Sequence, residues 1–240
     1  MPVSSNVRPH NMHDCWICGA AAYSAEHMVK ASDFRSVFGK VTQKTPAFRH
    51  SKDELNVHVR GAQADNLKFA PSLCGFCNNA RTQPHDRAWE RLSTFVRTSR
   101  PPLTSGSRIP LQQVFPCTVK QSMLNVHLYF LKLLGCYAVE YHVPLPVEHF
   151  GLCIQNSLPH PCVRLIFVHI AAGATRYSIQ VGHINAMNVG GKAVSANWFY
   201  IVGVLGVAVS YNEVGHPRLT RDRGWHPSDI GNQIRVAAPQ

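Results

Sequence analysis

Two pairs of cysteines with the same internal spacing are the residues best suited to chemistry. The sequence reads CWIC at 15–18 and CGFC at 74–77. Each CxxC turn can present two thiolates to one metal ion, and four thiolates complete the closed tetrahedral shell of a structural zinc site. A redox pair or a chance spacing is the alternative. Two such turns in one short region favour zinc held by Cys15, Cys18, Cys74 and Cys77.

Polar residues that could act on a substrate follow each of these turns. The acidic-histidine dipeptide Glu26-His27 lies between the cysteine pairs and is followed by apolar residues, Asn66 precedes a leucine, and Asn78 and Arg81 follow the second pair as Cys-Asn-x-x-Arg. This order resembles the HNH endonuclease family, in the variants whose last motif histidine is replaced by asparagine. The resemblance covers about residues 14–97.

The resemblance implies a role for each of these residues. His27 is expected to be the general base that takes a proton from the attacking water, because an imidazole titrates near neutral pH. Glu26 and Asn78 are expected to hold a catalytic Mg²⁺ or Mn²⁺ ion, which prefers oxygen ligands. Asn66 would orient the loop that bears His27. The residues expected to contact the phosphates of the nucleic acid are Arg81 and Lys30.

Three alternatives stay open at this point. Asn66 lies 12 residues before Asn78, a longer separation than is usual in the family. His85, rather than Asn78, could supply the final catalytic or metal-binding group. The chain could also be a non-catalytic zinc module that binds nucleic acid, or a nuclease that cuts RNA, because hydrolysis at phosphate does not itself distinguish the sugar.

The overall charge favours a polyanionic partner. The chain has 24 lysines and arginines against 13 acidic residues, a net charge of +11 spread over both halves. Such a balance disfavours cationic partners and suits nucleic acid, which we expect to be double-stranded DNA. A homodimer is compatible with this composition.

The chain is expected to be cytoplasmic, without membrane contact. Its first residues are polar and lack the apolar region of a secretory signal. The longest apolar stretch, 198–209, is interrupted by Gly203 and Gly206, and is shorter than the roughly 20 residues of a membrane-spanning helix. It is therefore interpreted as buried strand.

The predicted fold is of the α+β class, with a ββα-metal HNH domain at 14–97 after a flexible arm at 1–13. Within this domain, alternation of apolar residues over 55–59 predicts a half-buried strand, and residues 40–53 are interpreted as a polar loop. The helical spacing of apolar residues predicts a helix over 78–97, with Pro84 in its first turns or at a break.

Residues 98–112 are rich in proline, serine and glycine and are interpreted as a linker to an α+β accessory domain at 113–240. That domain is predicted to contain a central helix over 121–135, ended by Gly135, and an antiparallel sheet. The strands are expected within the β-branched and aromatic segments 162–170, 176–184 and 198–211. The other four cysteines, which show no paired spacing, are predicted to be buried thiols: Cys117, Cys136, Cys153 and Cys162.

Overall fold

The computed structural model of the chain describes residues 14–170, 178–213, 224–229, 231 and 233–238. The predicted arm at 1–13 lies outside the described residues. The helices are α1 (Ala31–Phe38), α2 (Gln83–Thr98), α3 (Leu111–Val114), α4 (Val119–Glu140) and α5 (Val147–Asn156), with a short 3₁₀ turn η1 (Asp65–Leu67) and a π-helical segment η2 (Phe76–Arg81). The strands are β1 (Ala47–Arg49), β2 (Val57–Val59), β3 (Arg108–Pro110), β4 (Val163–His169), β5 (Ile179–Val181), β6 (Asn185–Val189), β7 (Lys192–Val202), β8 (Leu205–Asn212) and β9 (Gln233–Arg235).

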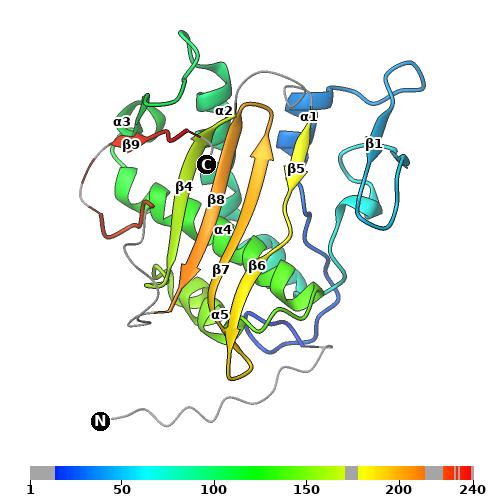
Figure 1. The fold of residues 1–240 in the computed structure, drawn as a ribbon, viewed down its shortest axis with the longest axis vertical. Helices are drawn as coiled ribbons and strands as arrows, with labels where there is room; N and C mark the ends of the chain where they lie inside the picture. The colour runs from blue at the N-terminus through cyan, green and yellow to red at the C-terminus, as the bar shows by residue number, and fades with distance from the viewer. Residues whose placement is uncertain (1–13, 171–177, 214–223, 230, 232, 239–240) are drawn as a thin grey trace.

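The main sheet is antiparallel and has five strands in the order β4-β8-β7-β5, with β6 also paired to β7. Strands β7 and β8 form a hairpin in which Val202 pairs with Leu205. Helices α2, α4 and α5 lie behind this sheet (Figure 1). The α+β class and the predicted antiparallel sheet packed on the central helix are confirmed.

Helix α4 does not end at the predicted residue. It runs through Gly135 to Glu140, so the prediction that Gly135 ends the helix is wrong. A glycine is needed at this position because the ring of Trp16 approaches the helix backbone closely. A Cβ atom at residue 135 would lie 2.5 Å from that ring. The missing side chain therefore lets the indole of the first CxxC turn pack against the helix backbone.

Gly135→Ala should consequently destabilise the protein, although alanine is the better helix former. The added methyl group must displace a large buried ring, and overpacking of this kind typically costs about 1–3 kcal/mol. Urea unfolding would measure the change. An unchanged or raised free energy of unfolding would contradict the close packing of Trp16 on α4.

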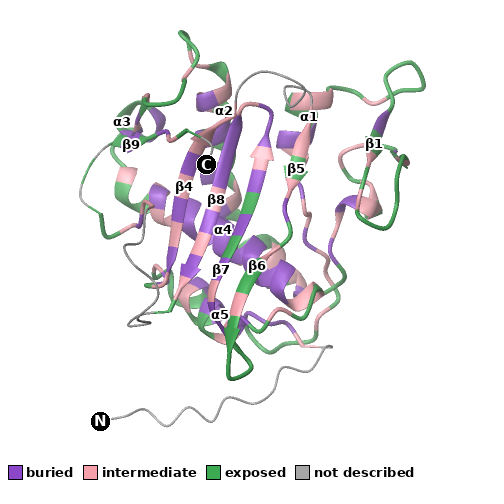
Figure 2. Ribbon diagram, viewed as in Figure 1, coloured by how far each residue is buried: buried purple, intermediate pink, exposed green. Residues whose placement is uncertain are grey.

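The larger of two hydrophobic clusters spans both predicted domains, and the smaller one lies within the first hundred residues. One cluster of buried side chains extends from Cys15 to Val236, and α2 packs along α4. The predicted linker segment contains β3, whose Ile109 is fully buried and pairs with Ile234 of β9. Figure 2 shows buried residues along α4 and in strands β4, β7 and β8. The N-terminal part therefore depends on α4 for part of its core.

Within the first hundred residues, the predicted strand and helix are present with altered ends. The strand is β2, and Leu55 is exposed before it begins. Strand β1, which pairs with β2, lies inside the segment interpreted as a polar loop. The predicted helix is divided into η2 and α2, with Pro84 in the first turn of α2, as expected.

Among the residues described, α4 alone is long and apolar enough to cross a membrane by length and composition. Of its most apolar window, 78% is buried inside the structure, as in the core helix of a folded domain. The 198–209 stretch forms β7 and β8, which confirms its interpretation as buried strand.

The four cysteines outside the CxxC turns differ in exposure. Cys136 is buried on α4, and Cys153 and Cys162 are partly buried. Cys117 is exposed, with a positive φ of 65°, in the turn before α4, so the prediction of a buried thiol is wrong there. Residues 116–118 of this connection between α3 and α4 are all exposed, as is common for a surface turn.

A buried carboxylate, Asp33 of α1, joins three elements of the core. Its oxygens accept hydrogen bonds from Trp89 Nε1 at 2.7 Å, Tyr200 Oη at 2.9 Å and Ser93 Oγ at 3.2 Å. Asp33 also forms an ion pair with Arg97, at 2.8 Å. The residue is fully buried. By bonding to α2 and β7, Asp33 fixes the position of α1, the helix that follows the Glu26-His27 segment.

Asp33→Ala should lower the free energy of unfolding by about 3–5 kcal/mol, because it leaves a partly buried guanidinium and three donors without an acceptor. Asp65→Ala is the matched control. Asp65 also pairs with a cation, at 2.8 Å from Lys68, but its side chain is 98% exposed, and we expect no measurable change. Equal losses in the two variants, measured by urea unfolding, would contradict this account of Asp33.

Two buried histidines predict a pH dependence of stability. Burial lowers the pKa of His85 and of His160 to about 4. In the unfolded chain the same groups titrate near pH 6.5, so between these values the unfolded state binds more protons and stability falls as the pH falls. We expect a loss of about 1 kcal/mol per histidine between pH 7 and 5.5. Urea unfolding at each pH, with zinc content monitored, measures it; a flat profile would contradict it.

Candidate functional site

The four cysteines of the two CxxC turns come together in space. Their sulfur atoms all lie within 4.8 Å of one another, and Cys18 Sγ is 3.6 Å from Cys74 Sγ. Four thiolates around one zinc ion, each at about 2.3 Å, would be roughly 3.8 Å apart. The cluster is therefore compatible with a structural zinc ion, as the sequence predicts.

Local backbone structure presents these thiolates. The first turn is closed by hydrogen bonds from the Cys18 and Gly19 amides to the Cys15 carbonyl, and Gly19 has a φ of 77°. In the second turn, the Cys77 amide donates to Cys74 Sγ at 3.4 Å, at the start of η2. The side chain of Arg81, one turn further along, donates to Cys77 Sγ at 3.1 Å. Burial raises the pKa of the Cys77 thiol, and a cation beside the sulfur opposes that shift and favours the thiolate that a metal requires.

Two extended segments connect the cysteine turns to the polar residues. Residues 23–28 and 67–73 run antiparallel, through hydrogen bonds between Ser24 and Leu73, from Phe69 to the Glu26 carbonyl, and from Met28 to the Leu67 carbonyl. The second segment leads into Cys74 and then into η2 and α2. The order is therefore extended segment, extended segment, helix, with α1, β1 and β2 inserted between the two segments.

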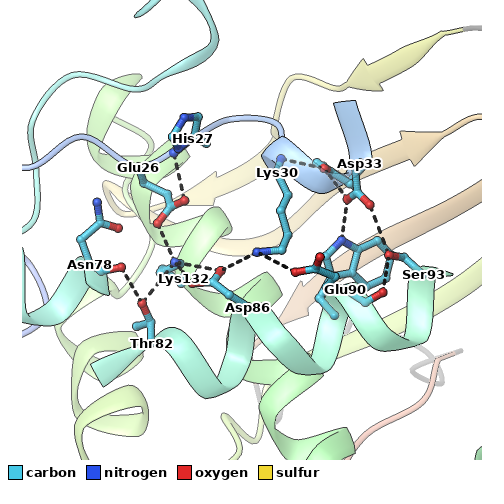
Figure 3. A network of polar contacts seen from close by, with 12 residues as sticks. Glu26, His27, Lys30, Asp33, Asn78, Thr82, Asp86, Glu90, Ser93 and Lys132 are labelled. Atoms are coloured by element: carbon cyan, nitrogen blue, oxygen red, sulfur yellow. Dashed lines mark hydrogen bonds and ion pairs between the residues drawn. The ribbon is translucent and has the colours of Figure 1, made fainter. Parts of the chain in front are cut away.

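Glu26 and Asn78 face each other across this arrangement. Asn78 Nδ2 donates to Ser24 Oγ at 2.9 Å and to the Ala25 carbonyl at 3.1 Å, which holds the amide beside the residue that follows, Glu26. Asn78 Oδ1 is buried and has no hydrogen-bond partner among the described residues. Figure 3 shows the Asn78 side chain next to the Glu26 carboxylate.

His27 is half-buried beside Glu26. Its backbone amide donates to Glu26 Oε1 at 2.9 Å, and its ring atom Nε2 is buried without a partner among the described residues. Burial lowers the pKa of His27 below its ordinary value, and the Glu26 carboxylate opposes this shift. A neutral imidazole with a free ring nitrogen can accept a proton.

A lysine that the sequence analysis does not single out completes the cluster. Lys132 of α4 is fully buried, and its Nζ lies 2.5 Å from Glu26 Oε2, 3.3 Å from Asp86 Oδ1 and 3.2 Å from Thr82 Oγ1 (Figure 3). Burial, the largest influence, favours the neutral amine, but the two carboxylates outweigh it and raise the pKa of Lys132 above its ordinary value. The signal in the sequence is a lone lysine within the apolar run LYFLKLLG.

The remaining predicted residues lie at several distinct positions. Asn66 belongs to the 3₁₀ turn η1, in which the Lys68 amide donates to the Asp65 carbonyl. Its Nδ2 donates to the carbonyl of His58 in β2. Lys30 Nζ lies 4.0 Å from Asp86 and 3.8 Å from Glu90. His85 is buried on α2.

Glu26 and Asn78, the two residues expected from the sequence to hold a divalent ion, are thus adjacent. Asn78 Oδ1 is an acceptor to which no group among the described residues donates. Each Glu26 oxygen has one partner, His27 N–H or Lys132, and a carboxylate oxygen has a second lone pair. A donor set of one carboxylate and one amide oxygen is of the kind that Mg²⁺ or Mn²⁺ prefers.

Comparisons with models of protein families, with curated proteins and with solved structures find no match to this chain.

Proposed function

We propose that the chain is a metal-dependent nuclease of the HNH type that hydrolyses phosphodiester bonds in DNA. The observation that carries the proposal is the meeting of Glu26, His27 and Asn78 next to the cysteine cluster. Asn78 is held to the segment before Glu26 by two hydrogen bonds. The two antiparallel segments followed by a helix support the same family, because a ββα unit with an inserted region has this order.

In the proposed reaction, the chain's own residues bind, orient and move a proton. Glu26 and Asn78 would hold a Mg²⁺ or Mn²⁺ ion, which supplies positive charge to the scissile phosphate and the leaving oxygen. His27 is neutral near pH 7 and accepts a proton from the attacking water at a ring nitrogen. Lysines and arginines of a chain with a charge of +11 attract the phosphate backbone.

One specific observation favours the second candidate, a non-catalytic zinc module that binds nucleic acid. Both oxygens of Glu26 already have partners within the chain, one of them a buried ammonium. A carboxylate that serves only as the partner of Lys132 would look the same. The two candidates make opposite predictions for DNA incubated with a divalent ion.

A cleavage assay with the full chain separates the candidates. Supercoiled plasmid, linear duplex DNA, single-stranded DNA and RNA are incubated with the purified protein in Mg²⁺, in Mn²⁺ or in EDTA. The nuclease is expected to nick or linearise the plasmid only when the ion is added. Salt-sensitive binding without cleavage of any substrate would support the module, and cleavage of RNA alone would correct the substrate.

A further inference from the structure

Lys132 has a position that its helix alone does not explain. It is fully buried in the middle of α4, among side chains that are almost all apolar. A buried ammonium is stable only where opposite charges and hydrogen-bond acceptors compensate for the loss of water. Here the compensating groups come from outside α4: Glu26 at 2.5 Å, Asp86 at 3.3 Å and Thr82 at 3.2 Å.

These groups belong to a row of alternating charges. Lys132 lies between Glu26 and Asp86, and Lys30 lies between Asp86 and Glu90, at 4.0 Å and 3.8 Å (Figure 3). The two lysines differ in one respect. Lys132 contacts Glu26, the proposed ligand of the divalent ion, whereas the ion pairs of Lys30 are with carboxylates of α2.

A divalent ion at Glu26 would share that carboxylate with the ammonium of Lys132. Two positive charges at the same carboxylate repel each other, and the repulsion is strong in a poorly hydrated interior. Without Lys132, Glu26 would have no ammonium partner, and Asp86 would keep only Lys30 at 4.0 Å. The two carboxylates would then attract a divalent ion more strongly than the present site does.

We propose that Lys132 is the resident cation of the site: it balances Glu26 and Asp86 while no divalent ion is bound, and it lowers the affinity for that ion. This inference rests on the proposed function, since it takes Glu26 as the ligand. Lys132 is therefore a positioning residue that acts through Glu26. It also makes α4 a part of the site rather than of a separate accessory domain.

The test is Mn²⁺ binding by the full, zinc-loaded chain carrying Lys132→Met. Mn²⁺ is titrated by calorimetry, and the melting temperature is recorded at each concentration. Without Mn²⁺ the variant should melt below the wild type, because Glu26 and Asp86 have lost the ammonium that they share. With Mn²⁺ it should bind the ion about tenfold more tightly than the wild type and recover stability, because the ion replaces the ammonium.

Two further variants make the result specific. Lys30→Met removes an ammonium from Asp86 but not from Glu26, and should bind Mn²⁺ as the wild type does. Lys132→Met combined with Glu26→Gln removes both charges of the closest pair, and should melt above Lys132→Met without Mn²⁺ and gain nothing from the ion. A merely structural lysine would give the opposite sign, with weaker binding in Lys132→Met.

Affinity for Mn²⁺ that is unchanged or weaker in Lys132→Met would overturn the inference, as would a variant that stays unfolded with millimolar Mn²⁺ present. The outcomes also separate this inference from the proposed function. Tighter Mn²⁺ binding by Lys132→Met, with no DNA cleavage by the wild type, would support the inference about Lys132 and contradict the proposed nuclease. Ion-dependent DNA cleavage by the wild type, without tighter Mn²⁺ binding in Lys132→Met, would support the nuclease and contradict the inference about Lys132.

Discussion

Replacement of His27 by alanine is expected to lower the rate of plasmid cleavage by about 10²- to 10⁴-fold, the range typical for loss of a general base. The ring has a buried nitrogen with no partner among the described residues, and burial keeps its pKa below the ordinary value. It is therefore neutral near pH 7 and can accept a proton. Removing it leaves the proposed metal ligands and the basic surface in place, so affinity for DNA should not change.

The measurement is a single-turnover cleavage rate with Mg²⁺, together with DNA affinity in EDTA. His58→Ala is the matched control. His58 lies on β2 in the same region and is exposed, and its hydrogen bond with Asn66 uses the backbone carbonyl. We expect wild-type cleavage from this variant. Equal loss of rate in both variants, or full activity in His27→Ala, would remove the proposed role of His27.

Loss of the cysteine cluster should destabilise the whole chain, not only its first hundred residues. The purified protein is expected to retain about one zinc ion per chain through dialysis, and Cys77→Ser to lose it. The buried cysteines belong to the same core as α4, and Trp16 packs against Gly135. The melting temperature should therefore fall by about 10 °C or more, in one cooperative transition.

Metal analysis and calorimetry measure this effect, and strong chelation of the wild type should reproduce it. Cys117→Ser provides the control, because Cys117 is an exposed thiol outside the cluster. It should retain both zinc and the wild-type melting temperature. A Cys77→Ser protein that melts like the wild type would show that the four thiols contribute no metal-linked stability. Two separate transitions would instead indicate two independent domains.

Local sequence pattern was sufficient where one segment decides the outcome. The CxxC spacing predicted each pair of thiols, because a tight turn places two thiols side by side, whereas the meeting of the two pairs depends on the tertiary structure. The apolar spacing predicted α2, and the β-branched runs predicted β4, β7 and β8. These features depend on the spacing of apolar residues and on turns of a few residues, and both can be identified in a short stretch of sequence.

Tertiary structure decided the features that depend on partners distant in sequence. Gly135 is typical of a helix end, but the ring of Trp16 makes a glycine necessary inside α4. Lys132 reaches Glu26 and Asp86 only because α4 packs on α2, and Asn66 bonds to β2 because η1 turns toward it. No local pattern can specify such a pairing, because its energy comes from burial and from charges brought together by the complete fold.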